Sequence, residues 1–238
     1  MNYPEDYINK IICGDCLEVM KGIPDGYVDL IITSPPYNLG NDHHIQTTKG
    51  RRTFTPYKDD YPETEYQESQ ILFLDECFRV LKDDGSMFYN HKNRIKDGFS
   101  IIPHCWIFKS KMKVKQELVW FNRSQNFDKI RFYPMTERVY WLSKQKQTKF
   151  HNSISHHDLF EWKAEGTDKE HKRSFPISMV TDILKCFPKE SIVLDPYCGS
   201  GTVLKASSEL GMKAFGIELN PEYCEIAQRR LAREYLFN

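Results

Sequence analysis

The stretch VDLIITSPPYN, residues 28–38, decides how this 238-residue chain is organised. Its apolar start, residues 28–32, predicts a buried strand, and the small polar residue, two prolines and aromatic that follow predict a rigid, exposed turn. Each proline fixes its own φ angle, disfavours helix at the preceding residue and lacks an N–H, so the turn offers hydrogen-bond acceptors. Such a turn can hold an amino group.

Length and composition, 238 residues of which 40% are hydrophobic, predict one large globular domain. The first twenty residues contain four acids and do not resemble a secretory signal, and no stretch approaches membrane-spanning length. Seven scattered cysteines are typical of reduced thiols rather than of a disulfide framework, and the C-x-x-C at residues 13–16 has no second pair at zinc spacing. We therefore expect a cytoplasmic protein.

Charge is unevenly distributed along a chain whose formal net charge is zero. Residues 91–150 hold fourteen Lys and Arg against four acids, so this segment carries +10 and the remainder −10. A solvated basic face balanced by acidic helices elsewhere would give this pattern. The aromatic residues interleaved with these cations favour a surface that contacts phosphates.

Strand and helix patterns alternate along the chain, which indicates an α/β domain with a largely parallel sheet. We expect strands over residues 10–15, 28–32, 86–90, 117–121, 138–143, 191–195 and 213–218. Helices are expected over residues 16–21, from 64 to a stop at Asp83-Asp84-Gly85, and over 99–109, 177–186, 203–210 and the segment after Asn220-Pro221.

Three polar segments show neither a helical nor a strand period. Residues 39–63 are long enough to predict a mobile functional loop, and residues 122–135 and 150–173 predict inserted recognition segments. The adjacent His43 and His44 have no carboxylate or cysteine at usable spacing, and histidines in loops are usually solvated. No metal is expected.

A second informative stretch, DPYCGSGT at residues 195–202, follows a short apolar strand and opens a helix. Glycines at a strand-to-helix turn let a ligand approach the backbone, and Glu218, 23 residues after Asp195, closes the next strand where it can bind ribose hydroxyls. The G-x-G pattern is shorter than the dinucleotide fingerprint, and the loop has no basic residue for a pyrophosphate. A nucleoside without phosphate therefore fits better than NAD.

Four motifs together resemble the permuted β group of exocyclic-amino DNA methyltransferases, which use S-adenosylmethionine: IICGDCLE (11–18), TSPPYN (33–38), DPYCGSGT (195–202) and GIELNPEY (216–223). In that family the target-base motif precedes the cofactor motif, as it does here. The resemblance implies one Rossmann-like methyltransferase domain over residues 1–238, with a mostly parallel seven-stranded sheet and circularly permuted motifs. It also implies that the strands ending near Asp15 and Glu218 lie side by side.

The resemblance assigns roles to particular residues. Asp15 corresponds to the acceptor for the cofactor's adenine amino group, Glu218 to the ribose acceptor, and Asp195 with the glycine loop to the methionine-end pocket. The implied cofactor-binding residues are Asp15, Asp195, Tyr197, Gly199, Ser200, Gly201, Thr202 and Glu218. The implied catalytic residues are Ser34, Pro35, Pro36 and Tyr37.

The predicted turn suits the chemistry of an aromatic amino group. Its lone pair is delocalised into the ring, so it is a poor nucleophile, and the site must accept its hydrogens to draw it toward tetrahedral geometry. We expect Ser34 and the Pro35 carbonyl to be these acceptors, with Tyr37 stacking on a flipped base. In-line approach of the amino nitrogen to the methyl group supplies rate through orientation.

The residue at position 34 bears on which base is modified. Family members that modify adenine N6 most often carry Asp there, whereas Ser is commoner among those that modify cytosine N4. HKRSFP, residues 171–176, also resembles a segment of Ser-type members. These features favour N4-cytosine, with N6-adenine as the alternative.

Two hypotheses from other classes remain open at this stage. A protein glutamine methyltransferase also uses a Pro-Pro-Tyr turn, but its cofactor motif comes first and Asn heads the turn. A noncatalytic DNA-binding relative would be expected to lose some of Asp15, Tyr37, Asp195 and Glu218, all of which are intact.

The expected partner is double-stranded DNA, which would place the protein at the nucleoid rather than at a membrane. So little chain lies outside the catalytic fold that a homodimer could help recognition, and a cognate restriction endonuclease is a further expected partner. The candidate DNA contacts are Arg51, Arg52, Arg123, Lys129 and Arg131.

Overall fold

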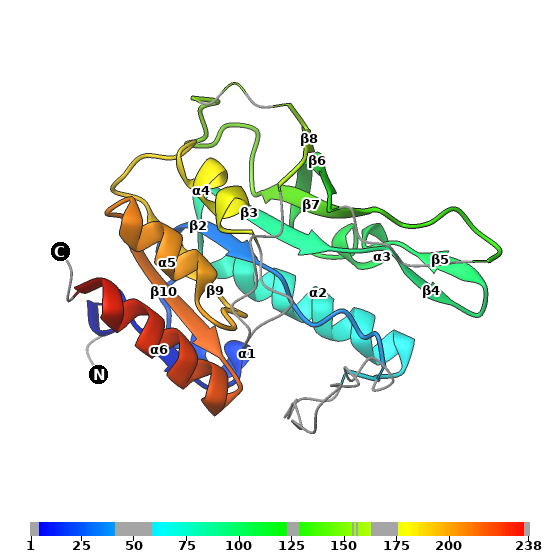
Figure 1. The fold of residues 1–238 in the computed structure, drawn as a ribbon, viewed down its shortest axis with the longest axis horizontal. Helices are drawn as coiled ribbons and strands as arrows, with labels where there is room; N and C mark the ends of the chain where they lie inside the picture. The colour runs from blue at the N-terminus through cyan, green and yellow to red at the C-terminus, as the bar shows by residue number, and fades with distance from the viewer. Residues whose placement is uncertain are drawn as a thin grey trace.

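A twisted β-sheet forms the centre of the molecule (Figure 1). The structure is a computed structural model, and it describes residues 5–40, 59–122, 129–153, 155, 157–162 and 176–235. Among these residues the sheet has eight strands, and seven run in one direction while β7 alone is antiparallel. In spatial order they are β1 (Ile11–Cys13), β10 (Lys213–Glu218), β9 (Ile192–Asp195), β2 (Val28–Thr33), β3 (Leu81–His91), β7 (Thr136–Ser143), β6 (Lys113–Phe121) and β8 (Leu159–Phe160).

The predicted α/β fold is confirmed, although the predicted count of seven strands is one too few. The additional strand, β8, has only two residues and lies within the polar segment 150–173, where no strand period marks it. It pairs with β6 at the edge of the sheet. A two-residue strand is held by its neighbour rather than by its own sequence pattern.

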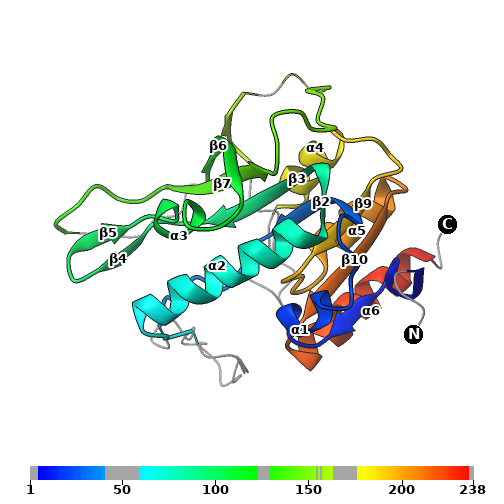
Figure 2. The same cartoon turned by 180° about the vertical axis from the view of Figure 1, so that it is seen from behind.

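Helices cover both faces of the sheet, as Figures 1 and 2 show. Side chains of one face form a core with α1 (Cys16–Met20), α2 (Glu63–Val80) and α3 (His104–Ile107). Those of the other face pack against α4 (Ile177–Leu184), α5 (Thr202–Glu209) and α6 (Pro221–Tyr235). A short 3₁₀ helix, Glu5–Tyr7, precedes β1. Because the central strands β2 and β9 are covered on both sides, their residues are almost all buried.

The strands at the two ends of the chain lie side by side, as the motif order predicted. Cys13 on β1 is in register with Glu218 on β10, and the Gly14 amide donates to the Glu218 carbonyl at 2.9 Å. This adjacency confirms the circular permutation. It places the residue after Gly14, Asp15, at the same edge of the sheet as Glu218.

The end of α2 differs from the sequence-based expectation. The helix ends at Val80, and Asp83-Asp84-Gly85, expected to stop it, lies within β3. A Cβ atom at Gly85 would lie 2.8 Å from the Leu81 side chain and 2.9 Å from the Asp29 carbonyl oxygen. Glycine is therefore needed there for close packing against β2, whose pairing register with β3 shifts at this point.

The predicted helix over residues 99–109 is wrong in its first half. Residues 99–101 form β5 (Phe99–Ile101), which pairs with β4 (Arg94–Lys96), and only the short α3 is helical. Asp97 and Gly98 join the two strands with φ angles of 51° and 83°. Asp-Gly is a strong signal for a two-residue hairpin loop, so this hairpin was readable from the sequence.

Several predicted segments lie outside the described residues. These are residues 41–58 of the loop 39–63, with Arg51 and Arg52, residues 123–128, with Arg123, and residues 163–175. In the part of the chain that the structure describes, no helix combines the length and apolar character that membrane crossing requires.

Candidate active site

The two halves of the predicted site begin side by side at the carboxyl ends of β2 and β9. These strands pair in parallel, with Leu30 opposite Val193. At their ends the Thr33 hydroxyl donates to Asp195 Oδ1 at 2.9 Å, although the two residues are 162 positions apart in sequence. The proline turn and the glycine loop therefore start from adjacent points of one sheet edge.

Hydrogen-bond polarity determines what Ser34 can do. Asn90 Nδ2 donates to the Arg138 carbonyl at 2.9 Å, so Asn90 Oδ1 is the atom that faces the turn. Tyr37 Oη donates to that oxygen at 2.6 Å, which commits its proton, and Ser34 Oγ lies 2.7 Å from Tyr37 Oη. Ser34 Oγ then donates to Tyr37 Oη or to Asn90 Oδ1, which lies 3.3 Å away. Its own proton is directed into the protein, so its lone pairs are left to accept from a substrate.

Glu137, at the start of β7, closes this network from the opposite side. Its Oε2 lies 3.3 Å from Tyr37 Oη, and its Oε1 accepts from Asn122 Nδ2 at 3.0 Å. Burial raises the pKa of Glu137, and burial together with the Glu137 charge raises that of Tyr37 well above its usual range. Tyr37 therefore remains a protonated hydroxyl.

Asn90 and Glu137 were not predicted from the sequence. Asn90 is the penultimate residue of β3, the strand next to β2, and it ends the predicted strand 86–90. A polar residue at the carboxyl end of a neighbouring predicted strand was a usable signal. Glu137 reaches the same edge because β7 runs antiparallel to β3, with Val139 opposite Asn90. Sequence alone did not indicate that reversal.

Two buried carboxylates dominate the glycine-loop half. Asp195 is 3% exposed and accepts the Tyr197 amide at 3.2 Å in addition to the Thr33 hydroxyl. Glu218, 8% exposed, accepts the amides of Gly199 and Asn220, both at 2.8 Å. Burial, with a smaller contribution from the Glu218 charge, raises the pKa of Asp195 to about 7.

The loop between Asp195 and α5 is shaped by its glycines and by α6. Gly199 and Gly201 have φ angles of 50° and 81°, and a Cβ atom at Gly201 would lie 3.1 Å from that of Ala227. Ser200 Oγ accepts from Arg230 at 3.1 Å. The buried Thr202 hydroxyl has no hydrogen-bond partner among the described residues.

Asp15 and Tyr197 are the two remaining residues predicted to bind the cofactor. Asp15 caps α1 by accepting the Glu18 amide at 3.1 Å, at the edge that β1 shares with β10. The Tyr197 ring packs against Phe73, with ring centroids 5.0 Å apart. Tyr197 thus contacts Asp195 through its backbone rather than through its ring.

These features suit a nucleoside ligand that carries positive charge. Within the described residues neither Asp195 nor Glu218 forms an ion pair with a cation, so a bound cation would relieve their repulsion. The Thr202 hydroxyl, which has no partner among the described residues, directly follows the loop with the two left-handed glycines. Within the described residues, no group of three or more His, Cys, Asp or Glu side chains is placed to hold a metal ion.

The fold, the permuted strand order and the two adjoining half-sites define a Rossmann-like methyltransferase. A family model described as DNA methylase, of the N6 and N4 type, matches residues 28–229, which is most of the chain. The chain belongs to this family, and the prediction made from its motifs is confirmed. It is an S-adenosylmethionine-dependent DNA methyltransferase that modifies exocyclic amino groups.

Known proteins resemble the chain over nearly its whole length. It is 29% identical to the type II methyltransferase M.HinfI of Haemophilus influenzae, over 95% of this chain and 69% of the relative. It is 26% identical to the type II methyltransferase M.BglII of Bacillus subtilis, over 98% of this chain and 71% of that one. The fold is shared with the cytosine-N4-specific PvuII DNA methyltransferase, at a TM-score of 0.73, 18% identity and coverage of 94% and 90% of the two chains.

Proposed function

We propose that this protein methylates the N4 amino group of cytosine in double-stranded DNA, and that residues 1–238 act as a single catalytic domain. The observation that carries the proposal is the polarity of the chain from Ser34 through Tyr37 to Asn90. It leaves a neutral hydroxyl as an acceptor at the head of the turn. Among members of this family, Ser at this position is commoner in the enzymes that modify cytosine N4.

The proposed mechanism assigns each residue of the turn a task. Ser34 and the Pro35 carbonyl accept the two amino hydrogens of a flipped base, and no donor within the described residues contacts that carbonyl. The Tyr37 hydroxyl is tied to Asn90, which fixes the plane of a ring that stacks on the base. Drawing the amino nitrogen toward tetrahedral geometry localises its lone pair for in-line attack.

The proposed cofactor site is the glycine-loop half. When bound, S-adenosylmethionine supplies an electrophilic methyl group. Asp195 and the loop residues Gly199, Ser200, Gly201 and Thr202 would hold its methionine end, Glu218 its ribose and Asp15 its adenine amino group. The unpaired charges of Asp195 and Glu218 support this assignment, because they favour a cationic ligand.

Mass spectrometry of nucleosides from DNA methylated in vitro tests the target base. N4-methylcytosine is expected, and N6-methyladenine would support the alternative instead. Ser34→Ala should lower the rate about 100-fold, since it removes a preorganised partner of the reacting group. Ser153→Ala is the control, because its exposed hydroxyl binds the Lys185 carbonyl, on α4's C-terminal cap.

DNA contacts are proposed for a projecting structure that we call the arm, the β4–β5 hairpin together with residues 129–135. Figures 1 and 2 show it extending from the sheet beyond the carboxyl end of β3. Phe99 and Phe132 on the arm are 78% and 100% exposed. Three exposed cations accompany them, Lys96, Lys129 and Arg131, and Arg131 donates to the Gly98 carbonyl at 3.3 Å. Cations with exposed aromatics suit phosphates and bases.

Salt dependence of DNA binding tests the arm. The slope of the logarithm of the DNA association constant against the logarithm of salt concentration is negative. Replacing Lys96, Lys129 and Arg131 with Gln should reduce its magnitude by about 0.9 for each lost phosphate contact. The matched control replaces Lys185, Lys189 and Lys213, exposed cations away from the arm, and should leave the slope unchanged. Equal slopes for both triple variants would contradict the arm's role.

Recognition and cellular context extend the proposal. We assign recognition of the DNA sequence to residues 39–63, 122–135 and 150–173. We also propose that the protein is cytoplasmic and associated with the nucleoid. It would act as a homodimer, together with a cognate restriction endonuclease. Similarity to type II methyltransferases supports the last point. Sedimentation tests the homodimer. Resistance of the modified DNA to an endonuclease that cuts the same site tests the restriction partner.

A further inference from the structure

The proline turn needs anchors other than its own amides. Pro35 and Pro36 have no N–H, so at these positions the turn can be fixed only through carbonyl groups and side chains. Tyr66, on the first turns of α2, provides such an anchor, because its hydroxyl lies 2.8 Å from the Pro36 carbonyl oxygen and donates to it. The Tyr66 side chain is buried, with the residue 3% exposed.

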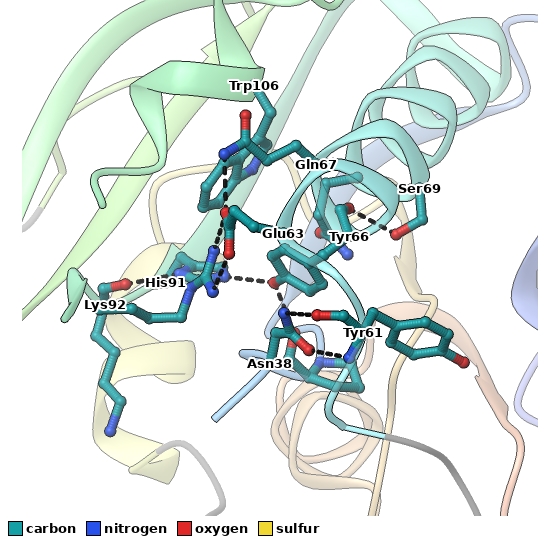
Figure 3. Close-up of polar contacts among 12 residues, drawn as sticks. Asn38, Tyr61, Glu63, Tyr66, Gln67, Ser69, His91, Lys92 and Trp106 are labelled. Atoms are coloured by element: carbon teal, nitrogen blue, oxygen red, sulfur yellow. Dashed lines mark hydrogen bonds and ion pairs between the residues drawn. The ribbon is translucent and has the colours of Figure 1, made fainter. Parts of the chain in front are cut away.

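His91, at the end of β3, shares the Tyr66 hydroxyl. Its Nε2 lies 2.7 Å from Tyr66 Oη, and its Nδ1 lies 2.8 Å from the Lys92 carbonyl (Figure 3). A carbonyl can only accept, so Nδ1 carries the proton and Nε2 is an acceptor. The single Tyr66 hydroxyl proton is therefore shared between two acceptors, the Pro36 carbonyl and His91 Nε2. Burial, and then the Arg94 and Lys92 charges, lower the pKa of His91 to about 3, so the ring is neutral.

The surrounding side chains hold both rings in place. The Arg94 guanidinium lies 4.6 Å from the Tyr66 ring centroid, and it pairs with both Glu63 oxygens at 2.8 Å. The His91 ring lies 4.5 Å from the Tyr37 ring, centroid to centroid. The start of α2 is thereby connected to both the carbonyl and the aromatic member of the turn.

The segment that leads into α2 holds the residues after the turn. Asn38 and Tyr61 exchange two hydrogen bonds, from the Tyr61 amide to Asn38 Oδ1 at 2.7 Å and from Asn38 Nδ2 to the Tyr61 carbonyl at 3.0 Å (Figure 3). Asp59 accepts the Asn38 amide at 2.7 Å. The second half of the turn, from Pro36 to Asn38, is therefore fixed relative to α2.

We propose that Tyr66 and His91 are positioning residues for methyl transfer: Tyr66 fixes the Pro36 carbonyl, His91 supports the Tyr37 ring, and the Pro35 carbonyl is thereby presented to the base. This inference rests on the proposed function of the turn. Neither residue touches the base or the cofactor. Their effect is exerted through the geometry of Pro36 and Tyr37.

Tyr66→Phe tests the anchor, since it keeps the ring and removes only the hydroxyl. We expect kcat to fall about 10- to 100-fold, because misplacement of reacting groups by about 1 Å has a cost of that order. The dissociation constant for S-adenosylmethionine should change less than about twofold, since no contact of the glycine loop is altered. Single-turnover rates and calorimetry measure the two quantities.

Tyr89→Phe is the matched control. Its hydroxyl is also buried, donates to Gln70 at 2.9 Å and accepts from Trp106 at 3.0 Å, and neither hydrogen bond involves the turn. The substitution keeps the Tyr89 ring and therefore its stacking on His91. A merely structural role for Tyr66 predicts that both variants lose similar stability and keep kcat. A positioning role predicts that only Tyr66→Phe loses kcat.

Nitrogen-15 NMR of the histidine rings gives a readout that needs no catalysis. The His91 Nε2 signal, assigned with a His91→Phe variant, should move when Tyr66 becomes Phe and stay in place when Tyr89 does. His91→Phe should also keep more of kcat than His91→Ala, because it preserves ring packing against Tyr37.

The outcomes separate the inference from the function on which it rests. An active wild type with a fully active Tyr66→Phe variant, or an equal kcat loss in Tyr89→Phe, overturns the inference alone. A wild type that methylates no DNA overturns the proposed function and the inference with it.

Discussion

Asp29 and Asp195 are equally buried, each 3% exposed, on the neighbouring strands β2 and β9. Asp29 lies near the amino end of its strand and binds Lys149 at 2.6 Å, Lys82 at 2.8 Å and the Ile192 amide at 2.9 Å. Asp195 lies at the carboxyl end of its strand. Its described partners are neutral groups.

This difference in partners gives the two aspartates opposite properties. Burial alone would raise both pKa values, but hydrogen bonds from Lys149 and Lys82 outweigh it and lower the pKa of Asp29. Burial without a cation raises the pKa of Asp195 to about 7. At the end of the sheet that holds Asp29, lysines of the protein itself thus neutralise the buried charge. The other end retains a charge that a cationic ligand can neutralise.

The largest expected effect comes from removing the unsatisfied charge. Asp195→Asn keeps an Oδ1 acceptor for Thr33 and the Tyr197 amide but cannot neutralise a cation. We expect affinity for S-adenosylmethionine, measured by calorimetry, to fall about 100-fold, the scale of a buried charge-assisted interaction. Unchanged affinity would show that the Asp195 charge does not face the cofactor.

The same variant should be more stable than the wild type without cofactor at pH 8. The folded pKa of Asp195 lies above its unfolded value of about 3.9, so ionisation opposes folding increasingly as pH rises from about 4 to 7. Asn removes this cost, and the melting temperature should rise by a few degrees at pH 8. The gain should shrink as pH falls toward 4.

Asp29→Asn should give the opposite result. It removes the carboxylate that Lys82 and Lys149 share, while Asp84 stays 3.7 Å from Lys149. Because both lysines are about one-third exposed, the loss should be about 2–3 kcal/mol, below the value for a fully buried pair. Urea unfolding measures it. Cofactor affinity of the folded variant should equal that of the wild type, and a large drop would contradict the division between the two ends.

The contrast between the half-sites explains how much the sequence could predict. The glycine loop and Glu218 lie close together in the chain, and glycines with positive φ leave a visible pattern, so this half was readable. The pairing of β1 with β10 followed from motif order alone. Both depend on local sequence or on connectivity.

The proline half required the sheet itself. The turn is surrounded by side chains of α2, β3 and β7, namely Tyr66, Asn90, His91 and Glu137. Only the order β2-β3-β7 and the packing of α2 bring them to one turn. A proline turn recruits such side chains because it lacks amides of its own. Of these four residues only Asn90, at the end of a predicted strand, carried a local signal in the sequence.

The pH dependence of cofactor binding should expose the Asp195 titration directly. Binding a cation favours the ionised carboxylate, so below a pH of about 7 binding must release a proton, and affinity should fall about tenfold per unit. Measurements between pH 5.5 and 7.0 keep the cofactor's amino group protonated, because α-amino groups titrate near pH 7.7–8.0. Glu218, whose pKa burial also raises, contributes in the same direction. Asp195→Asn should reduce this slope.

Thr33→Val is expected to have the smallest effect. It preserves the shape of the side chain and removes the hydroxyl that donates to Asp195 at 2.9 Å, a hydrogen bond that lowers the carboxyl pKa. The midpoint of the pH profile should therefore move upward by less than about one unit, while affinity at pH 8.5 changes less than about threefold. Calorimetry across the pH range measures both quantities. Thr33 also ends the strand that carries the proline turn. A shifted midpoint would therefore show that the base-binding half of the site changes the pKa of Asp195 in the cofactor half. An unshifted midpoint would show that the two halves are adjacent but not coupled.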